Sequence, residues 1–297
     1  MAKKEMPANA AERSRSRGKR NVVLRTVLLV LLALGVGFGV GVLVSPHMSF
    51  SNSSQTLAGR TTVAEDELDA VMGTYAVDDA EVPVTVREAI EETSSIEAVK
   101  NSDGTYDLPS VDAVLSIARN RILEQDAQQR GIEASDEDVT EYAKEILGTD
   151  DFAKIAAGYH MGAEQTKELL KRSTVIKKLR DEVVTTESPS TPNPPEPEDE
   201  EKRDEPTEGY ASYIIKLAGD EWDANANTWA REDGPFRIAL ADYTISNDAA
   251  TFAAAQAAYY VAYERYAAAQ QQISSEWTNY VNEALSNVNV RLSSLVA

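Results

Sequence analysis

The residues that could carry chemistry in this sequence are few, and their types limit what that chemistry can be. The 297 residues include two histidines, His47 and His160, and no cysteine. A thiolate nucleophile, a disulfide and a cysteine metal site are therefore excluded. His160 follows no nucleophile motif, and neither GxGxxG nor a P-loop opens any expected helix. The sequence predicts no catalytic residue, no metal site and no cofactor.

Carboxylates are abundant, but composition alone accounts for their pairing. The chain has 49 Asp and Glu against 29 Lys and Arg, for a net charge of -20. Residues 1–25 hold eight basic and two acidic residues, so the remainder is more acidic than the whole. A body this acidic repels phosphate backbones, which argues against nucleic acid as a partner.

Aromatic side chains are the stronger binding candidates, and 13 of the 20 lie in residues 210–297. Several fall on one face of a helix expected from Asp248 onward, where two interpretations stay open. The rings can form the core face of that helix, or some of them can contact extended segments of other proteins, because tyrosine joins apolar area to a hydroxyl. The candidate peptide-binding residues are Tyr159, Met161, Phe252, Tyr259, Tyr260, Tyr263, Tyr266 and Trp277.

A transmembrane helix is predicted at residues 26–44, TVLLVLLALGVGFGVGVLV, which carry no charge. At 1.5 Å per residue they extend about 28 Å, the thickness of a bilayer core. The basic residues before it place the N-terminus in the cytoplasm and residues 45–297 outside a bacterial-type plasma membrane. A cleaved signal peptide is the alternative, although its apolar run would be shorter. The glycines alternating within the span contain GxxxG spacings, which would allow a homodimer.

The elements that would position the candidates begin with a hairpin. Residues 73–77 and 81–84 flank the turn-forming pair Asp78-Asp79, and Thr85 offers an N-cap for a helix over 86–92. Pro83 restricts the second strand to a sheet edge, because proline donates no ladder hydrogen bond.

Four amphipathic helices are expected between Pro109 and Val184. Gly131 ends the first, and Ser135 with Asp138 forms a capping box for the second. Thr149 is predicted to cap the third, and the fourth spans about 163–184. The chain is therefore expected to be mainly α with a small β element.

The last third of the chain changes composition. Residues 186–209 hold six of the eleven prolines and nine acids, which predicts an extended linker without a core. A loop is expected at 219–234, and a bend near Ser274-Ser275 in the helical part that follows. Residues 287–293 alternate polar and apolar, which predicts a half-buried strand that must find its partner upstream.

The order of these elements resembles the SurA/PrsA/trigger-factor type of peptide-binding chaperone domain. The resemblance is carried by YAVDDAEVPVTVREAIEE, AVLSIARNRILEQDAQQRGIEASDEDVTEYAKEILG, TDDFAKIAAGYHMGAEQTKELLKRSTVIKKLRDEV and WTNYVNEALSNVNVRLSSL. It covers about 72–185 and 276–293, and it implies that the last strand pairs with the 73–84 hairpin. The parvulin prolyl isomerase domain that the family often carries between these parts is not recognisable here, so isomerase activity is not implied.

The resemblance implies a membrane-anchored extracytoplasmic chaperone that binds unfolded or newly exported polypeptides without catalysis. A bitopic cell-envelope scaffold that binds one folded partner is the alternative. The expected organisation is a basic tail at 1–25, the membrane helix at 26–44, a tether at 45–71, a SurA-like domain at 72–185, an acidic linker at 186–209 and an aromatic-rich part at 210–297, of which 276–293 complete the chaperone body.

Overall fold

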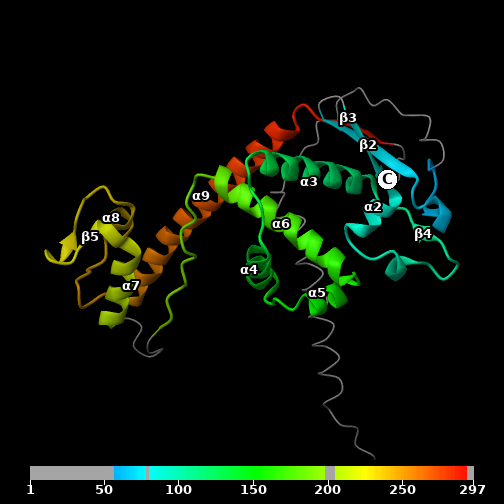
Figure 1. Ribbon diagram of the computed structural model, residues 1–297. Helices are drawn as coiled ribbons and strands as arrows, with labels where there is room; N and C mark the ends of the chain where they lie inside the picture. The colour runs from blue at the N-terminus through cyan, green and yellow to red at the C-terminus, as the bar shows by residue number, and fades with distance from the viewer. Residues whose placement is uncertain (1–56, 78–79, 198–204, 293–297) are drawn as a thin grey trace, which may run out of the picture. The chain divides into compact units, whose positions relative to one another are not determined.

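The computed structural model describes residues 57–77, 80–197 and 205–292, and the chain divides into two compact units. Unit 1 runs to Val184 and resumes at Trp277, whereas unit 2 is the continuous segment Thr185–Glu276. Each unit is mainly α, as expected (Figure 1).

The predicted membrane helix at 26–44 and the basic tail before it lie outside the described residues. Among the residues that the structure describes, no helix combines the length and the apolar character needed to cross a bilayer.

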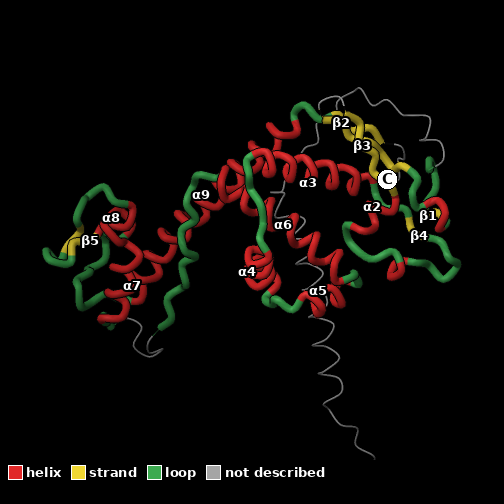
Figure 2. The backbone as a smooth tube through the Cα atoms, viewed as in Figure 1, coloured by secondary structure: helices red, strands yellow, loops and turns green. Residues whose placement is uncertain are grey.

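Unit 1 combines short strands with a set of packed helices, in which α6 contacts α3, α4 and α5 (Figures 1 and 2). Its elements are β1 (Thr62–Val63), η2 (Glu65–Glu67), β2 (Val71–Val77), β3 (Ala80–Thr85), α2 (Val86–Glu91), η3 (Glu97–Val99), β4 (Tyr106–Asp107), α3 (Val111–Gln129), α4 (Asp136–Leu147), α5 (Phe152–Tyr159), α6 (Ala163–Val183), the end of α9 (Phe252–Leu285) and β7 (Asn289–Leu292).

The larger sheet of unit 1 has the order β3-β2-β7, with antiparallel neighbours. Gly73 pairs with Leu292, which confirms the prediction that the last strand joins the 73–84 hairpin. Pro83 lies in edge strand β3, as its missing N–H requires. A Cβ at Gly73 would lie 2.7 Å from the Arg291 carbonyl oxygen and 2.9 Å from the Val114 side chain, so only glycine lets β7 and α3 approach this closely.

Local signals set most helix ends in unit 1. The Thr85 hydroxyl accepts the Glu88 amide at 3.2 Å, which begins α2 as expected. Ser135 and Asp138 form the predicted capping box of α4, with the Asp138 carboxylate accepting the Ser135 amide at 2.8 Å. The positive φ of 75° at Gly131, just after α3, needs a residue without a Cβ.

One predicted cap is wrong. Asp151 begins α5, since its carboxylate accepts the Lys154 amide at 3.0 Å. The Thr149 hydroxyl instead accepts the Asp151 amide at 3.2 Å, so Thr149 lies two residues before the capping residue. A carboxylate is favoured at this position because it also interacts with the positive end of the helix dipole.

Unit 1 has two adjoining cores that share α3. The first lies beneath the sheet and joins the hairpin, α2, the first half of α3 and β7. The second joins the rest of α3 to α4, α5, α6 and the last turns of α9, which supply the buried Trp277 and Val281. Residues from the C-terminal end of the described chain are therefore part of both cores.

Unit 2 packs two longer helices around a small irregular region. Three alanines of α9 are fully buried in the same core as Ile214 of α7, namely Ala254, Ala255 and Ala258. Their small side chains allow the two helices to approach closely. The elements are α7 (Glu208–Ala218), η5 (Gly219–Glu221), β5 (Trp222–Asp223), β6 (Thr228–Trp229), α8 (Pro235–Ala239) and α9 as far as Glu276.

Three expectations about this part of the chain are corrected. The expected loop at 219–234 contains the hairpin β5–β6, in which Trp222 and Trp229 pack edge to face at 5.2 Å. Helix α9 begins at Phe252 and continues without a break through Ser274-Ser275. The Ser275 hydroxyl donates to the Gln271 carbonyl at 2.8 Å, which satisfies it inside the helix.

A buried carboxylate holds the irregular region of unit 2 together. Glu221 is 0% exposed, and its Oε2 accepts the Phe236 amide at 2.9 Å. Its Oε1 lies 3.5 Å from Arg231 and 3.4 Å from Arg265, so two guanidinium groups compensate its charge. A Cβ at Gly234 would be 2.3 Å from Oε2, so a larger residue there would displace the Glu221 carboxylate.

Candidate functional site

The eight candidate peptide-binding residues fall into three groups in the structure. Phe252 and Trp277 are buried in the cores of unit 2 and unit 1, respectively. Neither ring is accessible to a peptide in this structure. Tyr159 and Met161 line a cleft in unit 1. The four tyrosines of α9 form a partly exposed row in unit 2.

The cleft in unit 1 is small and mainly apolar. Its volume is about 60 Å³, and its apolar walls come from α4, α5, α6 and the turn between the last two. Burial raises the pKa of Tyr159 at one wall, so this phenol stays neutral at physiological pH. The main apolar lining residues are Leu147, Ile155, Tyr159, Met161, Leu169 and Ile176.

The turn between α5 and α6 places Tyr159 and Met161 at the cleft. His160 ends α5 in the left-handed conformation at φ 58°, and its carbonyl accepts the Ser95 amide at 3.0 Å. The Met161 amide donates to the Ala156 carbonyl at 3.0 Å, so the chain folds back before α6 begins. The side chain of His160 is exposed. His160 therefore has a turn-forming role here.

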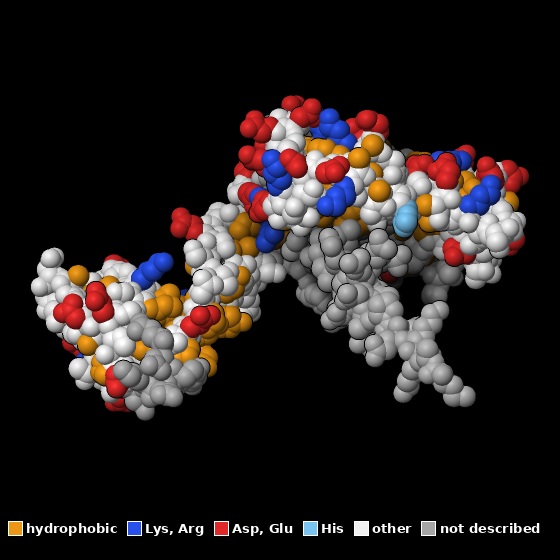
Figure 3. Space-filling view, turned by 90° about the horizontal axis from the view of Figure 1, so that it is seen from below, with side chains coloured by type: hydrophobic (Ala, Val, Ile, Leu, Met, Phe, Trp, Pro, Cys, Tyr) orange, Lys and Arg blue, Asp and Glu red, His pale blue; other side chains and the backbone are white. Residues whose placement is uncertain are grey.

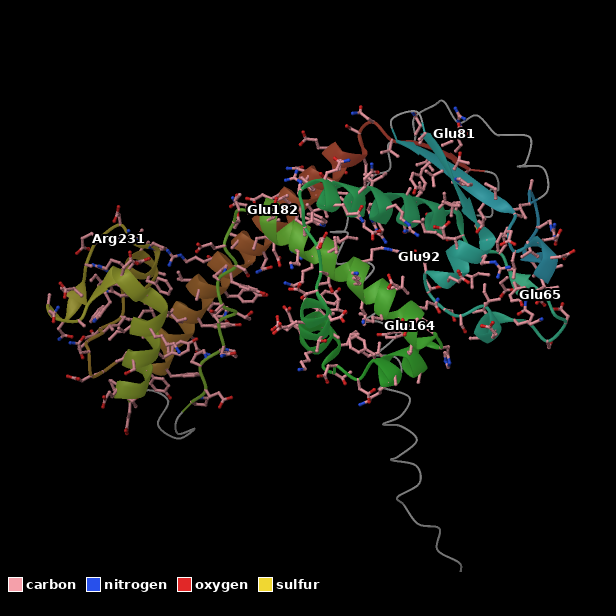
Figure 4. The ribbon with its side chains drawn as sticks, viewed as in Figure 1. Glu65, Glu81, Glu92, Glu164, Glu182 and Arg231 are labelled. Atoms are coloured by element: carbon pink, nitrogen blue, oxygen red, sulfur yellow. The ribbon has the colours of Figure 1, made fainter. Side chains whose placement is uncertain are left out.

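A chain of ion pairs borders the cleft. Arg172 of α6 contacts Glu92 at 2.5 Å and Glu124 at 3.4 Å, and its side chain is only 15% exposed. Arg121 extends the chain from Glu124 to Glu88. Figure 4 shows Glu92 just after α2, on the side of that helix nearest α6. Because carboxylates lie on two sides of Arg172, the guanidinium group is held as a fixed polar edge to an otherwise apolar cleft.

A second, larger groove in unit 1 is polar. It measures about 430 Å³ and is bordered by residues that include Glu65, Arg87 and Lys100. Lys100 lies 2.5 Å from Glu65, and Arg87 pairs with Asp69 at 2.8 Å. Both basic side chains at this groove are thus paired with carboxylates of the same unit. Within the described ranges, no cluster of three or more His, Asp or Glu residues is arranged to hold a metal ion.

Four tyrosines lie one after another along α9 with their rings tilted against each other. We call Tyr259, Tyr260, Tyr263 and Tyr266 the tyrosine ladder. The ring centres of Tyr259 and Tyr263 are 5.9 Å apart, and those of Tyr263 and Tyr266 are 6.4 Å apart. Tyr260 is 63% exposed and Tyr263 is 48% exposed. Figure 3 shows hydrophobic side chains gathered over α9. Phe252 and the alanines are therefore core, as the first interpretation expects, whereas the ladder reaches the surface, and contact of its rings with other proteins stays a prediction.

The proline-rich segment contacts unit 2, which was not predicted from the sequence. Residues 185–197 contain no helix or strand, as predicted, yet they are fastened to α7 and α9 (Figure 2). The Tyr213 hydroxyl donates to the Asn193 carbonyl at 2.6 Å, and burial raises the pKa of Tyr213. The spacing of Tyr210, Tyr213, Ile214 and Leu217 is typical of a helix face and could have identified α7.

No family model, curated protein or solved structure matches this chain. The class that the structure itself defines is a mainly α protein of two units, one with an apolar cleft and one with an exposed tyrosine ladder.

Proposed function

We propose that this chain holds extended, apolar segments of unfolded polypeptides without catalysis, as the resemblance to SurA-type chaperone domains implies. The observation that carries the proposal is the apolar cleft of unit 1, where Tyr159 and Met161 lie beside Leu169. Methionine is unbranched and polarizable, so it adapts to side chains of different shape.

The size of the cleft fits brief contacts with one side chain at a time. A water occupies about 30 Å³ of liquid, and a cavity of about 150 Å³ binds benzene. A cleft of about 60 Å³ thus has room for the end of one aliphatic side chain. Ordering an unfolded client also opposes binding, so the affinity is expected to be weak and broad.

The proposal includes the location of the client. With residues 26–44 as a membrane anchor, residues 45–297 would meet polypeptides as they leave the membrane on the outer side. Residues 45–297 are more acidic than the whole chain, whose net charge is -20, and this acidity keeps such a body soluble and away from anionic lipid. Newly exported polypeptides are the client class that this arrangement serves.

The test is the suppression of aggregation of a reduced, unfolded client by the full chain. We expect protection at a few-fold molar excess and a several-fold loss of it in the double variant Met161→Gln/Leu169→Gln. Both side chains are partly buried at the cleft, and an amide there opposes the entry of an apolar client group.

The matched control is Ile238→Gln, which changes an apolar side chain that is 64% exposed on α8, outside the cleft. This control should protect the client as well as the unaltered chain does. If the folded double variant protects equally well, the cleft is not the binding site. If the unaltered chain gives no protection, the proposed function is wrong.

A further inference from the structure

We infer that the tyrosine ladder of unit 2 recognises a neutral, proline-rich, extended segment of another polypeptide, and that the chain's own residues 188–195 occupy one edge of that surface. This goes beyond the proposed function, because the site lies in unit 2 and selects its ligand by proline content rather than by general apolar character.

The chain's own segment shows how such a ligand is held. Residues 188–195 read SPSTPNPP and carry no charge. Gln270 of α9 donates to the Ser188 hydroxyl at 2.8 Å, and Tyr213 of α7 donates to the Asn193 carbonyl at 2.6 Å. Pro192, between these two contacts, is buried. Figure 1 shows the segment descending beside α9 toward α7.

The upstream end of the segment is fastened by one carboxylate. Glu276 accepts the amides of Thr185 at 2.8 Å and Thr186 at 3.1 Å, together with the Thr186 hydroxyl at 2.6 Å. The segment thus enters unit 2 at a fixed point of α9, which directs the prolines that follow along the helix.

The contacts match the chemistry of a polyproline helix. That conformation has no internal hydrogen bonds, so its carbonyls are free to accept, while proline itself has no N–H to satisfy. A tyrosine offers a ring for the pyrrolidine group and a hydroxyl for the carbonyl, which is how aromatic grooves bind proline-rich peptides. Tyr213 makes this bond to Asn193, which lies between Pro192 and Pro194.

The tyrosine ladder offers the same chemistry beyond the part of unit 2 that residues 188–195 contact. Gln270, which donates to Ser188, follows the last tyrosine of the ladder, Tyr266, by one turn of α9, so the ladder adjoins a contact already made. Tyr260 and Tyr263 leave much of their rings exposed. Because the ladder follows one face of a single helix, it fits one extended strand, and the seated proline segment identifies the chemistry of that strand.

The experiment measures binding of a fluorescent peptide with the sequence of residues 188–195, SPSTPNPP, to the full chain by anisotropy. The own segment competes for the surface at high effective concentration. The variant Pro192→Ser/Pro194→Ser/Pro195→Ser is expected to weaken the binding of the chain's own segment to this surface. If the chain's own segment occupies its edge of the surface about nine tenths of the time, and the peptide needs that edge to bind, we expect the peptide to bind this variant about tenfold more tightly.

In the triple-serine background, Tyr263→Ser should weaken peptide binding several-fold, because it removes an exposed ring of the ladder. Tyr243→Ser is the matched control, since Tyr243 is exposed in the same unit but outside the ladder, and it should leave binding unchanged. A peptide with serine at each proline should bind far more weakly.

Equal binding of the proline-free peptide, or undiminished binding by the Tyr263→Ser variant, would overturn the inference. So would the absence of peptide binding to the triple-serine variant. These outcomes are separate from the proposed function, because suppression of client aggregation depends on Met161 and Leu169 in unit 1. Loss of client holding with peptide binding intact would reject the proposed function alone.

Discussion

Unit 1 and unit 2 differ in how far along the chain their cores reach. In unit 1, β2 pairs with β7, and Arg291 forms an ion pair with Glu81, 210 positions away in the sequence. Unit 2 is one continuous segment, Thr185–Glu276. Unit 1 can therefore complete its sheet only after the chain has passed through all of unit 2, because β7 follows unit 2 in the sequence. Bringing β7 back to β2 across this distance costs loop entropy.

The two units also treat their aromatic residues differently. Tyr75, Tyr106 and Tyr142 of unit 1 are buried, and burial raises the pKa of Tyr142 to about 12. In unit 2, Tyr260 and Tyr263 keep large exposed areas. A tyrosine on a helix face is covered only where another element packs over that face. Tyr210 of unit 2 is also buried, so the same residue type is core where another element covers it and accessible surface where none does.

The largest expected effect tests the dependence of unit 1 on its last strand. Leu292→Asp places a charge at a buried position of β7, opposite Gly73. Without a partner for that charge, we expect unit 1 to lose about 3–5 kcal/mol of stability. Hydrogen exchange measured by mass spectrometry should show faster exchange in α3 and the hairpin, with unit 2 unchanged.

The control for this change is Asn289→Asp, at an exposed position of the same strand. Its effect should stay within about 0.5 kcal/mol. Equal protection of unit 1 in the two variants would show that β7 is not needed for its core, and the contrast between the units would disappear.

A smaller effect, confined to unit 2, is expected from Glu221→Gln. The neutral amide keeps the size of the side chain but loses its charge toward Arg231 and Arg265, and it places an N–H group where only acceptors fit. We expect a loss of about 1–3 kcal/mol, measured by hydrogen exchange in α7 and α8. Glu232→Gln, at a largely exposed carboxylate, should cost about 0.5 kcal/mol or less. A shared loss in both units would contradict their separation.

The smallest effect concerns the fastening of the proline-rich segment. Hydrogen bonds from Thr186 and Thr185 lower the pKa of Glu276 from 4.5 to about 2. Because the folded pKa is depressed, the stabilisation is fully present above pH 4.5 and is lost as the pH falls toward 2. The NMR shift of the Thr186 amide should therefore titrate near pH 2, and this titration should vanish in Glu276→Gln. An inflection near 4.5 would show that the carboxylate is not bonded.

Much of the local structure could be predicted because its causes are local. Thr85 caps α2, Ser135 and Asp138 cap α4, and Gly131 follows α3, each through groups a few residues apart. The strand at 289–292 was also predictable, but the resemblance, not its alternating pattern, indicated its partner. The cap at Asp151 was missed because two neighbouring polar residues compete for the same role.

The candidate site was predictable only in part. Spacing marked the aromatic stripe of α9, but it could not separate the buried Phe252 from the exposed Tyr260, since both belong to one amphipathic helix. The contact of Asn193 with Tyr213 left no pattern in the sequence, because composition predicts an extended segment whether or not something binds it.

The sequence by itself determined several helix ends in unit 1, how acidic the chain is and which residues could offer aromatic surface. Only the tertiary structure decided that Trp277 is core, that Tyr159 and Met161 border a cleft and that the tyrosine ladder stays open. The physical reason is that capping and periodicity act within a few residues, whereas burial depends on which distant element covers a given face.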